Sequence, residues 1–379
     1  MAARHRTDAE SARVFSPAQI TAYAEARLFG ENAPPGEISR IELHNGTLPS
    51  QLERRLQGSD LRYERVRQRN PREPIYRAGN TLFIPQFSGF GRRQRYEEMI
   101  GAYREAAGHH LDFASMELQD DPRRTDQSYE NNAYDFVAGL FVPDSSYEGR
   151  RVFAGGGIAD ISTIIFGPAA AVAKQAGVRE RGASEYLDAQ IVDVGGKPVL
   201  NISYVYADQA GVIIDKLMRE YNAVARSTGR DRDIGLYFFG RVGGLLPSMA
   251  RHDLVYPTGV VSETDLMQRH PPVYPLRNVL ASGMVNRGKN LNSTSVINET
   301  VEQLARARHK GCMSVDMELQ EVEQAIARAE TRFPHLHPYA GVVLYVSDLP
   351  LRSDTLAAEL DSDRGERAAV GKIITHITR

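Results

Sequence analysis

The chain has 379 residues, of which 42% are hydrophobic and 25% charged, and its formal net charge is −2. This ordinary composition provides enough apolar residues for a sizeable core and excludes a general electrostatic attraction to nucleic acid or to a membrane surface. A single cysteine, Cys312, excludes an internal disulfide framework and a cysteine-based metal cluster.

The first 75 residues are polar, rich in Arg and Glu, and interrupted by prolines. Residues 1–14 contain no apolar segment of signal-peptide length, and no apolar run approaches the roughly 20 residues that cross a bilayer, so we expect a cytoplasmic protein. Ser16-Pro17 is typical of a helix start, and a second short helix is expected over Ser50 to Gln57. We predict that residues 1–75 form an extension that packs on the main domain or on a neighbouring subunit, or that is partly disordered.

The main domain is expected over residues 76–379 as an α/β fold. Its first elements are a strand over Thr81–Ile84 and a helix over Arg92–Ala107, and the very polar residues 116–134 predict an exposed loop or insertion. The later predicted elements are a helix over Ala169–Gly177, a hairpin of Ala189–Val194 and Pro198–Val205, a helix over Gly211–Val224, strands over Ile234–Phe239 and Asp253–Tyr256, a helix over Ser295–Arg308, a strand edge over Met313–Asp316, a helix over Glu318–Phe333, a strand over Gly341–Val346 and a closing helix from about Arg364. This alternation favours a mixed, mostly parallel central sheet flanked by helices.

Three segments of the C-terminal half carry residues suited to binding and catalysis. Each follows a predicted strand, where open α/β sheets bind their ligands. The first is the glycine-rich stretch Phe239–Leu245, predicted as a loop. Its glycines, Gly240, Gly243 and Gly244, would let the backbone approach an anion, and Arg241 could bind a phosphate with two hydrogen bonds. A tight turn with a solvated or structurally paired Arg241 explains the same stretch.

The second and third segments are Asp316-Met317-Glu318 and Ser347-Asp348. Met317 could pack on the face of a sugar, and Glu318 could accept hydrogen bonds from its hydroxyls. Asp348 follows a buried strand, where the pKa of a carboxyl can rise so that it acts as a general acid. Taken singly, each segment has another explanation. Asp316-Met317-Glu318 also fits a helix start, where acidic residues are favourable, and Asp348 also fits an aspartate that caps a helix or turn.

Taken together, the order and spacing of the three segments resemble the nucleoside phosphorylase and nucleosidase superfamily, and within it AMP nucleosidase. The matching residues, within about 190–379, are Gly240–Leu245 with Asp253–Tyr256, Asp316-Met317-Glu318, and Ser347-Asp348. The resemblance implies a single nucleoside-phosphorylase-type domain that cleaves the N-glycosidic bond of a purine nucleoside or nucleotide without a cofactor, as a homo-oligomer. It implies that Asp348 protonates the base, that Glu318 holds the ribose hydroxyls, that Met317 packs beneath the sugar, and that water or inorganic phosphate is the nucleophile.

Two positions depart from the family pattern. Tyr204–Gln209 stands where family members usually carry a glycine-bearing stretch that lines the nucleophile pocket, so Tyr206 and Asp208 become candidate substrate-binding residues. Arg241 stands where the family usually has Ser, Thr or His, and could hold a 5′-phosphate. This altered pocket favours hydrolysis over phosphorolysis.

The candidate residues outside these three segments are supported by weaker sequence patterns. Arg92 and Arg93 open a predicted helix and could bind phosphate there, or they are exposed helix charges; Gly155–Gly157 with Asp160 is an alternative phosphate loop. Glu263 is a candidate for the base pocket or a solvated residue. The histidines lack a convincing set of partner ligands, so no metal site is expected.

Two further functions stay open beside a nucleosidase. One is a phosphate-dependent nucleoside phosphorylase, and the other is a non-catalytic protein that binds a nucleotide or small molecule on the same fold. Glu318 and Asp348 together favour an enzyme, whereas the bulky Tyr204–Gln209 stretch favours a binder or an unfamiliar substrate. A dehydrogenase is disfavoured because no GxGxxG stands between an early strand and helix.

Overall fold

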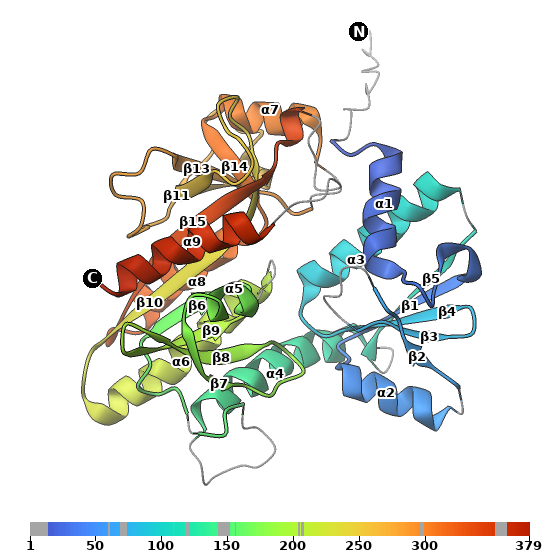
Figure 1. Ribbon diagram of the computed structural model, residues 1–379, viewed down its shortest axis with the longest axis horizontal. Coiled ribbons are helices and arrows are strands. Elements are labelled where there is room, and N and C mark those ends of the chain that lie inside the picture. Colours follow the sequence, from blue (N-terminus) through green and yellow to red (C-terminus); the bar gives the residue numbers. More distant parts are fainter. Residues whose placement is uncertain are drawn as a thin grey trace, which may run out of the picture.

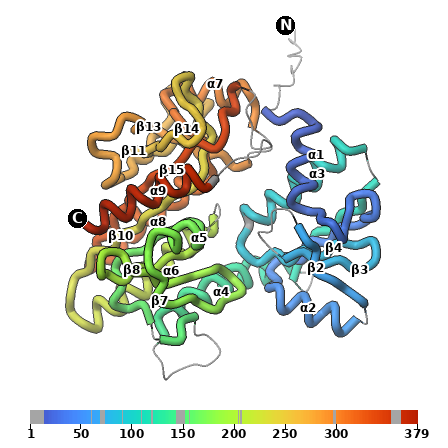
Figure 2. Tube along the Cα trace, in the orientation of Figure 1, coloured from blue at the N-terminus to red at the C-terminus, as the bar shows by residue number. Residues whose placement is uncertain are grey.

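Two β-sheets with helices packed against them organise the chain, as the computed structural model shows (Figure 1). The structure describes residues 14–59, 61–68, 74–108, 110–118, 121–142, 152–155, 157–203, 205, 208–295, 299–352 and 362–379. Residues up to about 116 gather on one side of the molecule, and later residues form the other side (Figure 2). The α/β class predicted from the sequence is therefore confirmed.

The first sheet has the strand order β2-β3-β4-β1-β5. Its strands are β1 (Arg40–Asn45), β2 (Glu64–Arg65), β3 (Tyr76–Ala78), β4 (Thr81–Gln86) and β5 (Asp112–Met116). Successive side chains of β4 point to opposite faces. Phe83 packs with Leu52 and Leu56 of α2 (Pro49–Gly58), whereas Leu82 and Ile84 join a cluster that includes α1 (Pro17–Leu28) and α3 (Phe90–Ala107). The sheet thus lies between α2 and the α1–α3 pair (Figure 1).

The boundary drawn from sequence at residue 75 falls inside this sheet. β1 pairs in parallel with β4, from Arg40↔Thr81 to Asn45↔Gln86, and with β5 on its other side. Ile41 and Leu43 of β1 are fully buried. The polar composition of residues 1–75 therefore obscures core positions such as these two, because only alternate residues of a strand face the core.

The exposed loop predicted over residues 116–134 is wrong, because α4 (Pro122–Phe141) begins within it. Asp121 caps this helix by accepting a hydrogen bond from Arg123 N at 3.0 Å. Its buried positions recur at helical spacing and are Thr125, Tyr129, Ala133, Phe136, Val137, Gly139 and Leu140. The polar residues that suggested a loop lie mostly on the opposite, solvent-facing side of the helix.

The second sheet is mixed, and less parallel than expected. Its strands are β6 (Thr163–Phe166), β7 (Gly177–Arg181), β8 (Ala189–Val194), β9 (Lys197–Ile202), β10 (Arg232–Gly244), β11 (Leu254–Ser262), β12 (Tyr274–Pro275), β13 (Arg287–Asn292), β14 (Cys312–Asp316) and β15 (Leu336–Asp348). β10 pairs in parallel with β6 and β15, and antiparallel with β14. The pairs β10–β15, β15–β11, β11–β13, β13–β14 and β14–β10 close a ring of five strands.

Local sequence signals account for several boundaries in this sheet. The predicted hairpin is present as β8 and β9, and its turn residues Gly195 and Gly196 have φ of 61° and 84°, which suits glycine. The helix predicted over Ala169–Gly177 ends earlier, at Ala173, because Gly177 begins β7. The helix predicted from Ser295 begins instead at Val301 (α7, Val301–His309), where Thr300 and Gln303 form a capping box.

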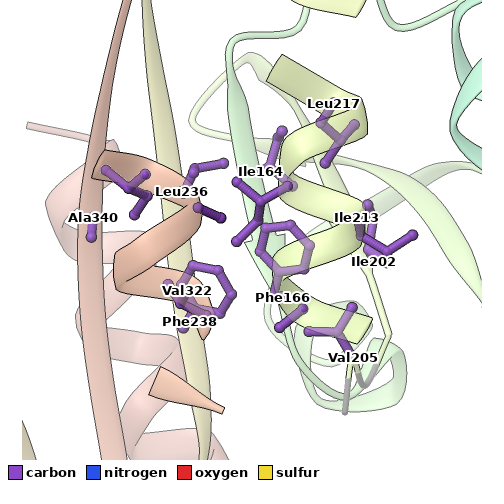
Figure 3. Packing of buried hydrophobic residues seen from close by; sticks show 14 of the residues in the cluster. Ile164, Phe166, Ile202, Val205, Ile213, Leu217, Leu236, Phe238, Val322 and Ala340 are labelled. Atoms are coloured by element: carbon purple, nitrogen blue, oxygen red, sulfur yellow. The ribbon is translucent and has the colours of Figure 1, made fainter. Parts of the chain in front are cut away.

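The second sheet has a hydrophobic cluster on each of its faces. One face packs against α4, α6 (Asp208–Thr228) and α8 (Leu319–Arg332), and the other against α5 (Ala169–Ala173) and α9 (Ser362–Ile377). On the first face the rings of Phe166 and Phe238 are stacked, with their centroids 4.5 Å apart, between residues such as Ile213 and Val322 (Figure 3). None of the helices in the described part of the chain is long and apolar enough to span a membrane.

Candidate functional site

A pocket of about 160 Å³ lies where the ends of β10, β14 and β15 meet, and helices α1 and α3 also contribute to it. Apolar and aromatic side chains form much of its wall, among them Phe166, Val205, Phe238, Phe239 and Leu344. Its charged lining residues are Arg27, Arg95, Arg241, Asp316, Glu318 and Asp348. Six residues chosen from the sequence line it, namely Gly240, Arg241, Gly243, Met317, Glu318 and Asp348.

Strand pairing explains why three segments so far apart in the sequence meet here. Gly243 of β10 stands opposite Asp348 of β15 in the parallel register and opposite Val315 of β14 in the antiparallel register. The end of β10 therefore lies between the ends of β15 and β14. The second and third segments follow directly from those two strand ends, so their side chains reach the same pocket.

The glycine-rich stretch predicted as a loop is instead the end of strand β10, which continues to Gly244. A Cβ on Gly243 would lie 2.8 Å from Val315 Cγ1, and one on Gly244 would lie 3.0 Å from Leu349 Cδ2. Neighbouring side chains thus pack closely against these glycines. This packing accounts for glycine at both positions, and binding of an anion is not needed to explain it. Gly244 lies outside the set of residues that line the pocket.

Asp348 is the last residue of β15 and is 5% exposed. Ser347 Oγ donates a hydrogen bond to Asp348 Oδ1 at 2.6 Å and also lies 3.2 Å from the carbonyl oxygen of Val242. The serine therefore links the carboxyl group to β10 and restricts its rotation. This arrangement presents a fixed carboxyl group to a largely apolar pocket.

The Asp316-Met317-Glu318 segment joins β14 to α8. Glu318 is the N-cap residue of α8, and its Oε2 accepts a hydrogen bond from Met317 N at 3.3 Å. Asp316 is buried, and its Oδ1 accepts a hydrogen bond from Asn290 Nδ2 at 2.7 Å. Burial and the nearby charge of Glu318 raise the pKa of Asp316 well above its ordinary value. Asp316 therefore anchors the segment, and Glu318 remains half-buried at the pocket wall.

Arg241 also lines the pocket and is tied to α9 through a tyrosine. Its Nε donates to Tyr345 Oη at 3.1 Å, and Tyr345 Oη donates to Glu366 Oε1 at 3.1 Å. Glu366 is 8% exposed, so this chain of hydrogen bonds runs into the protein interior. The arginine predicted from sequence to bind an anion is thus held at the pocket by the hydroxyl of Tyr345, which in turn is held by Glu366 of α9.

Sequence reasoning missed two arginines of the pocket, both from the N-terminal part of the chain. Arg95 of α3 is 8% exposed, and its Nη1 lies 3.6 Å from Met317 Sδ. Arg27 of α1 has its Cζ 4.5 Å from the centroid of the Tyr23 ring. Arg95 stands three residues after the buried Arg92 and so on the same helix face. This spacing could have suggested that the two arginines face the same way, but their burial is evident only from the structure.

Arg92 and Arg93, the two arginines predicted from sequence to bind phosphate, lie outside this pocket, as does Asp208. Arg93 forms ion pairs with Glu97 at 3.0 Å and Glu117 at 2.5 Å. Arg92 is buried on α3 but does not belong to the pocket lining. Asp208 accepts a hydrogen bond from Gly91 N at 3.1 Å, so its carboxylate occupies the start of α3, where an anion would bind.

The two remaining candidates from the sequence are Glu263 and Tyr206. Glu263 accepts hydrogen bonds from Thr294 N and Oγ1, at 2.6 and 2.8 Å, and from Gln303 Nε2, and it does not line the pocket. Tyr206 lies outside the described residues. Within those residues, no three His, Cys, Asp or Glu side chains are arranged to hold a metal ion.

Glu299 is a buried carboxyl group near Asp348 that the sequence did not suggest. It is 4% exposed, and its Oε1 has no hydrogen-bond partner in the described part of the chain. Burial, followed by the charge of Asp348, raises the pKa of Glu299 well above its ordinary value. At pH values between the ordinary glutamate pKa and this raised pKa, the folded protein therefore binds a proton that the unfolded protein releases.

A glutamine at position 299 is expected to stabilise the protein increasingly as pH rises. Because the folded-state pKa is raised, the free energy of unfolding of the wild type falls with pH above the ordinary glutamate pKa of about 4.3, whereas glutamine cannot titrate. Melting temperatures of wild type and Glu299→Gln at pH 4, 6 and 8 check this. Glu302→Gln, on the exposed side of α7, is the control, and a difference independent of pH would contradict the expectation.

Comparison with known proteins gives a low-level structural similarity. No protein-family model and no curated protein matches the chain. Solved structures similar to it include 5′-methylthioadenosine/S-adenosylhomocysteine nucleosidase from Neisseria meningitidis, at 13% identity over 57% of this chain and 99% of that one, with a TM-score of 0.42. Purine nucleoside phosphorylase from Toxoplasma gondii has 14% identity over 56% and 89%, with a TM-score of 0.44. Uridine phosphorylase from Schistosoma mansoni has 13% identity over 59% and 88%, with a TM-score of 0.43.

These solved structures are nucleosidases and phosphorylases, the superfamily that the three sequence segments resemble.

Proposed function

We propose that the protein hydrolyses the N-glycosidic bond of a purine nucleoside or nucleotide. The observation that carries the proposal is the convergence of Met317, Glu318 and Asp348 on one pocket, from segments joined by the pairing of β10 with β14 and β15. A nucleoside needs an apolar surface for the base, hydrogen-bond acceptors for the sugar hydroxyls and a proton donor for the leaving base. This pocket carries all three.

Each part of the reaction has a group in a suitable environment. Cleavage passes through an oxocarbenium-like state, so protonation of the leaving purine lowers the barrier, and Asp348 is the proposed donor. The hydrogen bond from Ser347 holds the Asp348 carboxyl in one orientation. Glu318 accepts hydrogen bonds from the ribose hydroxyls and Met317 packs beneath the sugar, while the phenylalanine rings of the wall contact the base. Water is the proposed nucleophile.

Arg241 is the proposed contact for a 5′-phosphate. Arg241→Ala is therefore expected to lower kcat/KM for nucleoside monophosphates about 10- to 100-fold, the range for a charge-assisted hydrogen bond, and to change kcat/KM for nucleosides little. Tyr345→Phe, which removes a hydrogen-bond partner of Arg241 but keeps the cation, is the control and is expected to have the smaller effect. Equal losses for monophosphates and nucleosides would remove Arg241 from phosphate recognition.

The direct test of the proposed function is release of free base. Purified protein is incubated with purine and pyrimidine nucleosides and monophosphates, with and without inorganic phosphate, and the base is followed by chromatography. Release without phosphate supports a nucleosidase, and strict dependence on phosphate means a phosphorylase. Tight binding of one compound without release of base means a non-catalytic binding protein.

A further inference from the structure

Arg95 stands apart from the other cations of the pocket because it is buried. Three carboxyl groups line the pocket, Asp316, Glu318 and Asp348, and the arginines Arg27 and Arg241 are only half-buried. Arg95 is 8% exposed and comes from α3, a helix packed on the first sheet. A buried guanidinium needs partners that compensate for its lost hydration, so its surroundings indicate what it does.

Two of the groups around Arg95, Met317 and Glu318, belong to the proposed ribose site. Its Nη1 lies 3.6 Å from Met317 Sδ, and its Cζ lies 5.5 Å from the centroid of the Tyr23 ring on α1. The acidic side chains that face it are Glu318, Glu98 and Glu299, with the phenol of Tyr96, and the charge of Glu318 acts on it most strongly. Burial lowers the pKa of Arg95 to about 10, so it remains a cation at neutral pH.

Glu318 needs such a cation if it is to bind a sugar. It follows the buried carboxyl group of Asp316 by two residues, and the charge of Glu318 raises the pKa of Asp316. A protonated Glu318 would keep a proton on one oxygen and lose part of its capacity to accept hydrogen bonds from hydroxyls. A fixed positive charge beside it favours the ionised form.

We infer that Arg95 is a positioning residue for the proposed reaction, which acts through Glu318 and Met317. It keeps Glu318 ionised and holds the Met317-Glu318 segment against the ribose. The inference rests on the proposed function, and it extends the working site from the second sheet to α3. The N-terminal part of the chain then takes part in substrate binding.

Kinetics of Arg95 variants as a function of pH test this role. Arg95→Met is expected to lower kcat/KM about 10-fold, mainly through KM, and to move the acid limb of the pH profile to higher pH, because Glu318 then protonates more easily. Arg95→Lys, which keeps the charge, is expected to recover most of the acid limb. In a Glu318→Gln background, Arg95→Met is expected to leave the acid limb unmoved and to raise KM less than it does in the wild type, because only the contact with Met317 is then lost. An unmoved acid limb, or equal losses in both backgrounds, would overturn the inference.

A second measurement does not depend on turnover. Urea unfolding of wild type, Arg95→Met, Glu318→Gln and the double variant is expected to show coupling between positions 95 and 318. Arg95→Met leaves the negative charge of Glu318 without its cation. In the Glu318→Gln background that charge is absent, so Arg95→Met should lower the free energy of unfolding less. Arg92→Met, at another buried arginine of α3 outside the pocket, is the control and is expected to add to Glu318→Gln without coupling. Additive effects for Arg95 would overturn the inference. If no nucleoside loses its base, the proposed function fails, while this cycle still reports on Arg95 and Glu318.

Discussion

Asp348→Asn is expected to lower kcat for release of a purine base by about 10²- to 10⁴-fold, the range for loss of a general acid. Asparagine has nearly the same shape as aspartate and still accepts a hydrogen bond from Ser347, so the pocket should keep its form. It carries no transferable carboxyl proton, so the purine would have to leave as an anion. KM should change little, because proton donation matters mainly in the transition state.

The leaving group provides the sharpest check on that assignment. A riboside with a nitrophenol leaving group needs no protonation, so Asp348→Asn should slow its hydrolysis far less than that of a purine nucleoside. Circular dichroism and melting temperature establish that the variant is folded, and Asp363→Asn, at an exposed carboxylate of α9, is the matched control. Full activity of Asp348→Asn on purine nucleosides, or equal losses on both substrates, would exclude Asp348 as the acid.

The sequence predicted the segments of the site better than it predicted how they come together. Met317, Glu318 and Asp348 are predicted because the order and spacing of the three segments resemble the nucleoside phosphorylase and nucleosidase superfamily. The pairing of Gly243 with both Val315 and Asp348 joins residues more than 70 positions apart. No local pattern encodes such a pairing, so the end of β10 was predicted as a loop.

The N-terminal part of the site escaped prediction for a related reason. Arg95 follows Arg92 and Arg93 in a strongly charged helix, and burial of an arginine depends on what faces it from elsewhere in the chain. Here the facing residues are Met317 and Tyr23. The polar composition of residues 116–134 led to the wrong prediction of an exposed loop. Tyr129 and Ala133 belong to a buried stripe of α4, but polar neighbours outnumber the residues of that stripe.

Glu318→Gln is expected to lower kcat/KM for ribonucleosides by about 10²- to 10³-fold, because two charge-assisted hydrogen bonds from sugar hydroxyls are weakened together. The same substitution should matter far less for a deoxynucleoside that lacks a hydroxyl held by Glu318, so 2′-deoxy- and 3′-deoxynucleosides identify which hydroxyl it binds. Glu321→Gln, on the first turn of α8 and outside the pocket, is the matched control. If ribonucleosides and both deoxynucleosides lose activity equally, Glu318 acts on the fold of the segment and not on the sugar. A selective loss for one hydroxyl would place the ribose against α8, within reach of the segment that Arg95 contacts through Met317.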